Sequence, residues 1–133
     1  QKKNALPAIR QMFLETRLKP CCVELRFLDQ NVAPVRHASF AMLAGLLQNH
    51  ENLEQLNQEA CKMTAAGILK EMDSASRLGL TEDKFFENSK KFLELARKGL
   101  EARKLGEEKY LIPAEEILSR RKNPAQVLLE QHC

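Results

Sequence analysis

The stretch that decides the fold reads ASFAMLAGLL and spans residues 38–47. Ser39 is its one polar residue, so a helix here is apolar on nearly every side, and such a helix is buried on most of them. Pro34 suits the first turn of a helix, and the sequence therefore predicts a helix over residues 35–48. We expect Gly45, which has no side chain, to let another element approach this helix closely.

Downstream of this helix, apolar residues keep recurring at helical spacing. Residues 52–78 form a second predicted helical region, with a break near Gly67 left open. Thr81 is expected to cap the next helix, which runs to about Lys104 before Gly106 ends it. The aromatic residues of that helix are expected in the core: Phe85, Phe86 and Phe92.

Three further signals complete the helical pattern. Residues 110–121 predict another helix. Asn123 is expected to cap the last helix, with Pro124 at its first position. Upstream, residues 6–14 predict a short helix.

Residues 21–28 are the one convincing strand, because their side chains alternate between two faces. Cys22, Glu24 and Arg26 share one of these faces. The preceding residues 17–20 are interpreted as a break. A single strand leaves its backbone donors and acceptors unpaired. We therefore expect its partner to come from an earlier part of a longer chain or from a second copy.

These elements define a mainly α fold class, a helical bundle with one or two β-strands. The chain of 133 residues has the length of one domain, and we expect a single domain over residues 1–133. Within it, residues 17–29 form the strand segment and residues 34–133 form a helical layer.

Composition excludes several classes of function. Lys plus Arg is 21 and Asp plus Glu is 18, and the net charge of +3 is too small and too mixed to argue for nucleic acid or an anionic membrane. No apolar run approaches the roughly 20 residues of a membrane span, and no signal peptide is evident. The four cysteines lack metal-ligand spacing, so we expect reduced thiols and a cytoplasmic protein. Because the chain begins with Gln1, we expect it to be a piece of a longer protein.

The residues with chemical potential lie in VELRFLD, residues 23–29. Strand spacing places Glu24 and Arg26 on the same face, about 6–7 Å apart. A carboxylate is a hard oxygen ligand for Mg²⁺, and a guanidinium grips a phosphate or carboxylate through two parallel hydrogen bonds. The pair can hold the metal and the anion of a nucleotide-dependent reaction. The alternative is a structural ion pair on a solvated sheet face, with Asp29 capping the turn.

An ordered series of short motifs resembles the C-terminal region of glutamate–cysteine ligases of the plant and bacterial type. The series begins with Arg17-Leu18-Lys19, continues through the strand that carries Glu24 and Arg26, and reaches the helix that ends in Gly45-Leu46-Leu47. The tail adds further matches: Ala96-Arg97-Lys98-Gly99-Leu100, Arg103, Tyr110-Leu111, Pro113, Glu116-Ile117-Leu118, Pro124-Ala125 and Leu128-Leu129. Together they span about residues 8–131.

The resemblance implies an enzyme that joins the γ-carboxylate of glutamate to the amine of cysteine, the first step of glutathione synthesis. ATP phosphorylates the γ-carboxylate, and the amine attacks the resulting acyl phosphate, with Mg²⁺ bridging carboxylates and phosphates. Carried over, Glu24 is a metal ligand and Arg26 a catalytic residue that contacts the transferred phosphate. Arg17 is a candidate for binding a substrate carboxylate. The strand would belong to a larger antiparallel active-site sheet, so the whole protein would be α+β.

The chain also departs from the family. Many relatives have R-G-A-D after the strand, whereas this chain has Arg26-Phe27-Leu28-Asp29. The bulky Phe27 and Leu28 would narrow the site, so the identity of the amine substrate, cysteine or another amine, is left open. The remaining metal-binding carboxylates lie N-terminal to this segment in the family, so we expect the chain alone to be inactive and the N-terminal part of the parent to be its partner. The alternative is a non-catalytic helical interaction or assembly module. A homodimer formed through the strand edge is also expected.

Overall fold

The computed structural model describes residues 16–19, 22–25 and 31–132, and the chain divides into two compact units, residues 1–30 and 31–133. The expected helix over residues 6–14 lies outside the described residues. The fold class is confirmed as mainly helical. None of the helices in the described part combines the length and the apolar character that crossing a bilayer requires.

The first unit contains a two-stranded antiparallel sheet. Strand β1 (Thr16–Lys19) pairs with β2 (Cys22–Leu25). The predicted strand is thus confirmed over its middle, but the predicted break over residues 17–20 is wrong for β1. Lys19 precedes Pro20, and a residue before proline is pushed toward extended conformations. One partner of β2 therefore lies within the chain itself.

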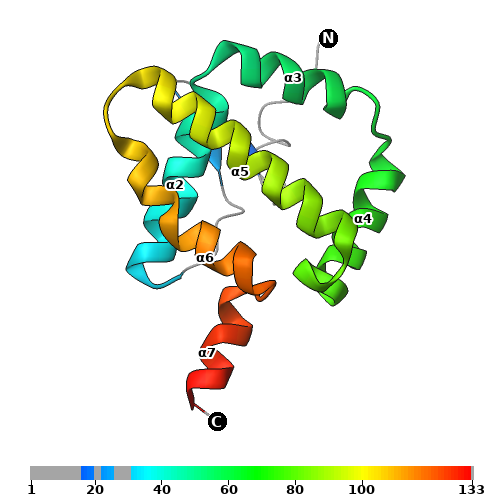
Figure 1. Ribbon diagram of the computed structural model, residues 1–133. Helices are drawn as coiled ribbons and strands as arrows, with labels where there is room; N and C mark the ends of the chain where they lie inside the picture. The colour runs from blue at the N-terminus through cyan, green and yellow to red at the C-terminus, as the bar shows by residue number, and fades with distance from the viewer. Residues whose placement is uncertain (1–15, 20–21, 26–30, 133) are drawn as a thin grey trace. The chain divides into compact units, whose positions relative to one another are not determined.

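The second unit consists of helices joined by short connections. Its elements are α2 (Ala33–Leu47), α3 (His50–Ala60), α4 (Ala65–Leu78), the 3-10 turn η1 (Gly79–Thr81), α5 (Asp83–Arg103), the 3-10 turn η2 (Glu107–Leu111), α6 (Ile112–Arg120) and α7 (Pro124–His132). Helix α5 packs across α2, and η2 and α6 return along α2 (Figure 1).

The core lies where α2, α5 and η2 meet. Its buried apolar residues are alanines on α2 and, apart from Ala96, leucines on the other two elements: Ala38, Ala41, Leu93, Ala96, Leu100 and Leu111. The expectation that α2 is buried on most sides is only half right, because Phe40 is 56% exposed and Leu47 is 43% exposed. The fully buried positions of α2 are alanine and glycine, whereas the larger Met42 and Leu46 pack against the core while only partly buried.

Gly45 fulfils its expected role at the crossing of α2 and α5. A Cβ atom placed on Gly45 would lie 2.1 Å from the backbone oxygen of Ala96. Nearby, the buried Asn52 of α3 donates from Nδ2 to the carbonyl oxygens of Gly45, at 3.0 Å, and Leu95, at 2.7 Å. One side-chain amide therefore joins α3 to both crossing helices.

The expected second helical region is broken, but not at Gly67. Helix α3 ends at Ala60, and α4 begins after Thr64, whose side-chain oxygen accepts a hydrogen bond from the Gly67 N–H at 3.1 Å. Gly67 lies in the first turn of α4 instead of at the break. A threonine side chain that satisfies a free N–H is a strong helix start signal.

The predicted N-terminal cap of α5 is wrong, whereas that of α7 is confirmed. Thr81 is not the cap of α5, because its hydroxyl donates to the Leu78 carbonyl at 2.5 Å and Glu82 occupies the cap position. Asn123 is confirmed as the cap of α7. Its side-chain oxygen accepts from the Gln126 N–H, and the Gln126 side-chain oxygen accepts from the Asn123 N–H, each at 2.8 Å.

The predicted aromatic stripe of α5 is only partly buried, since Phe85, Phe86 and Phe92 all retain some solvent exposure. The Arg121 guanidinium lies 4.0 Å from the ring centroid of Phe86 and also bonds Asp83 at 2.8 Å. The Arg121 cation thus covers the Phe86 ring, which we expected to be packed among core residues.

Candidate functional site

The hairpin of the first unit places two of the three predicted site residues opposite each other. Arg17 of β1 pairs in register with Glu24 of β2. Directly opposed residues of an antiparallel pair lie on the same face, with Cβ atoms about 4.5–5.5 Å apart. The register therefore brings a guanidinium-bearing residue and a carboxylate-bearing residue together on one face of the sheet.

The third residue, Arg26, lies outside the described residues, as does Asp29. The predicted juxtaposition of Glu24 with Arg26 along one strand thus stays a prediction. Sequence reasoning missed the pairing of Glu24 with Arg17 because it took residues 17–20 for a break. Once β1 is recognised as a strand ending at Lys19, the short connection to Cys22 fixes the register.

Glu24 fits one part of a magnesium site. Mg²⁺ is commonly held by one or two carboxylates together with substrate phosphates and waters. Within the described ranges, no three His, Cys, Asp or Glu side chains gather closely enough to hold a metal ion. Glu24, which is half-buried, has the chemistry of one carboxylate ligand.

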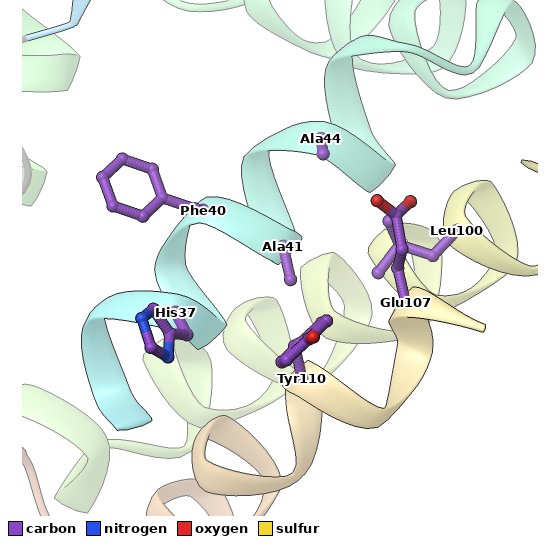
Figure 2. Close-up of a pocket in the computed structure, with 7 residues that line it drawn as sticks. All are labelled: His37, Phe40, Ala41, Ala44, Leu100, Glu107 and Tyr110. Atoms are coloured by element: carbon purple, nitrogen blue, oxygen red, sulfur yellow. The ribbon is translucent and has the colours of Figure 1, made fainter. Parts of the chain in front are cut away.

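The helical unit also contains a concave surface that sequence reasoning did not find. A pocket of about 340 Å³ lies between α2, η2 and the end of α5. Its lining is mostly apolar and aromatic, with a single carboxylate (Figure 2): His37, Phe40, Ala41, Ala44, Leu100, Glu107 and Tyr110. No sequence signal marks it, because its two sides come from segments far apart along the chain.

The polar groups of this pocket have defined neighbours. The rings of His37 and Tyr110 meet edge to face, with centroids 6.4 Å apart and planes at 72°. The Lys109 ammonium lies 5.3 Å from the Tyr110 ring centroid. Glu107 Oε2 lies 3.3 Å from Arg103 Nε, so the carboxylate is ion-paired on its protein side. His37 is exposed and also lines the pocket.

The groups with shifted pKa values belong to the helical unit and are not among the residues that line this pocket. A hydrogen bond from Lys91 lowers the pKa of Glu59, and one from Lys98 lowers the pKa of Glu51. A hydrogen bond to Glu115 raises the pKa of the Arg97 guanidinium. All three pairs join different helices, so we interpret them as ties between elements rather than as acid–base groups of a site.

Comparison with known proteins gave no relative. No family model matches this chain, and neither a curated protein nor a solved structure matches it at a significant level.

Proposed function

We propose that the chain is part of an ATP-dependent ligase resembling glutamate–cysteine ligase. The observation that carries the proposal is the register of the hairpin, in which Arg17 lies directly opposite Glu24. A ligase of this kind needs a carboxylate for Mg²⁺ close to a guanidinium for an anionic substrate. The motif series that runs from Arg17 to Leu129 supports the same assignment.

In the proposed reaction, the γ-carboxylate of glutamate attacks the terminal phosphorus of ATP, and ADP leaves. The amine of cysteine then attacks the acyl phosphate, phosphate leaves, and an amide bond forms. Glu24 would supply one carboxylate ligand to the magnesium that accompanies ATP. Arg26 would contact the transferred phosphoryl group, and Arg17 would bind a substrate carboxylate.

The hairpin would be one edge of a larger antiparallel sheet in the whole protein, with the helical unit as a supporting layer. On this proposal the N-terminal part of the parent supplies the remaining metal ligands, the chain alone is inactive, and the enzyme is cytoplasmic. Phe27 and Leu28 would narrow the site, so the amine substrate could differ from cysteine.

The deciding experiment follows ADP release by the longer protein with Mg-ATP, glutamate and cysteine. Glu24→Gln and Arg26→Ala should each abolish turnover while the circular dichroism spectrum stays unchanged. Glu54→Gln is the matched control, because Glu54 is an exposed carboxylate on α3. Full turnover in both site variants would mean that the strand is structural. Turnover with a different amine would retain the ligase assignment and change the substrate.

The second candidate is a non-catalytic interaction or assembly module. It is favoured by α4, none of whose residues is buried, and by Leu69, which is 67% exposed on that helix. Exposed apolar surface of this kind often marks a protein interface. Sedimentation of the chain at rising concentration, with and without Leu69→Lys, would detect self-association through α4. The homodimer expected through the strand edge should survive this substitution.

A further inference from the structure

The pocket lined by His37, Glu107 and Tyr110 combines mostly apolar walls with a single carboxylate. Ala41 and Ala44 form its floor on α2, and Tyr110 stands on the η2 side (Figure 2). A small ligand site typically has such apolar walls and a few polar groups that fix orientation. At about 340 Å³, this pocket lies near the lower end of the about 300–1,000 Å³ typical of ligand pockets.

The acceptor is Oε1 of Glu107. The other oxygen, Oε2, is buried, accepts no hydrogen bond from the described residues, and faces Arg103 Nε at 3.3 Å. Oε1 is not among the buried atoms, and no hydrogen bond or ion pair reaches it from the described part of the chain. The ion pair with Arg103 therefore anchors the carboxylate through one oxygen and leaves the other for a ligand's donor.

The surrounding charges select against charged ligands. Arg103 already balances the charge of Glu107, and the Lys109 ammonium already lies over the Tyr110 ring. A cationic ligand would be repelled by these two nearby cations as well as attracted by the single Glu107 carboxylate. An anionic ligand would approach the Glu107 carboxylate. Like charges at short range disfavour each of these ligands, whereas a neutral ligand meets neither penalty.

We propose that this pocket binds a small, neutral aromatic molecule that carries an N–H donor. The ring lies against Tyr110 and the alanine floor, and the N–H donates its hydrogen bond to Glu107 Oε1. Aromatic rings gain favourable edge-to-face or offset contacts in such a position. The inference is independent of the proposed ligase function, because it uses residues of the helical unit alone.

Indole is a suitable probe, because it is a neutral ring with one N–H. Titrated into the isotope-labelled 133-residue chain, it should shift amide resonances of α2 and η2 and saturate in the millimolar range expected of a fragment. N-methylindole keeps the ring and lacks the donor, and it should bind about fivefold more weakly, the effect of one hydrogen bond. Tryptamine adds a cationic ammonium to the indole ring and should bind no more tightly than indole.

A pair of variants tests the acceptor directly. Glu107→Leu should reduce indole affinity to that of N-methylindole, while Glu108→Leu, at the adjacent position, should leave it unchanged. If Glu107→Leu unfolds the protein, the comparison of the two probes on the unmodified chain decides the matter. Equal affinity for indole and N-methylindole, shifts confined to other elements, or tighter binding of tryptamine would each overturn the proposal.

Discussion

Gly99 of α5 meets Gly45 of α2 so closely that a Cβ atom on Gly99 would lie 1.9 Å from the Gly45 carbonyl oxygen. The approach is also close from the other helix, since a Cβ atom on Gly45 would collide with the backbone of Ala96, three residues before Gly99 on α5. Both contacts are between one helix's glycine and the other helix's backbone, so each requires that the glycine carry no side chain. The crossing is thus set by backbone contact, and the apolar side chains around it pack to fit.

Gly45→Ala is expected to destabilise the protein by about 3 kcal/mol or more, because overpacking at a backbone contact cannot be relieved by a side-chain rotation. Thermal unfolding monitored by circular dichroism measures the loss. Gly67→Ala is the control, since its Cβ atom would approach only the Thr64 hydroxyl oxygen, at 3.1 Å, and alanine favours a helix by about 1 kcal/mol. An unchanged melting temperature in Gly45→Ala would contradict the close approach.

Asn52→Leu is expected to cost about 2–3 kcal/mol, because it removes both hydrogen bonds from Nδ2 and leaves two carbonyl groups without that donor. Chemical denaturation provides the measurement. Asn57→Leu on the exposed side of the same helix is the matched control, with a change within about 0.5 kcal/mol. Equal losses for the two variants would show that the buried amide has no special role.

The ion pair between Glu59 and Lys91 gives a prediction about pH. Since the hydrogen bond from Lys91 lowers the pKa of Glu59 below its ordinary value of 4.5, the stability it adds is present above pH 4.5 and is lost as the pH falls through the lowered pKa. In an NMR titration, Lys91→Met should return the Glu59 pKa toward the ordinary value. Lys90→Met, at the neighbouring position, should not. A Glu59 pKa that is the same in all three proteins would refute the pairing.

The start of α7 depends on the reciprocal bonds between Asn123 and Gln126. Asn123→Ala should destabilise this helix by about 1 kcal/mol, the usual effect of removing a cap. Faster hydrogen exchange of the first backbone amides of α7 would measure this loss of stability. Gln126→Glu keeps the reciprocal acceptor and should preserve the slow exchange. Fast exchange in both variants would indicate that the glutamine amide itself is required.

The sequence predicted best those features that depend on neighbours within one helical turn. Pro34 and Asn123 marked helix starts correctly, because their effects are on backbone groups close by. The close approach at Gly45 was also predicted, since a glycine inside an apolar helix leaves room for a neighbouring backbone. Its counterpart Gly99 could not be identified as the contact, because nothing local specifies which helix crosses where.

The features that were missed depend on distant contacts. The partner strand β1 was misread because its polar residues and the following Pro20 resemble a turn when taken alone. The pocket that brings His37 to Tyr110, and the carbonyl groups that bind Asn52, arise only once α2, α5 and η2 have packed. Of the predicted site, Arg26 lies outside the described residues, and the opposition of Arg17 and Glu24 could be recognised only from the register of the hairpin.

Helix α4 buries none of its residues and packs chiefly against η1. Its helical hydrogen bonds are therefore held mainly by the Thr64 cap and by local propensity rather than by the shared core. Segments of this kind open on their own, at a lower free energy than global unfolding. The 133-residue chain should consequently not melt as a single cooperative unit, and its calorimetric enthalpy of unfolding should exceed the van't Hoff value.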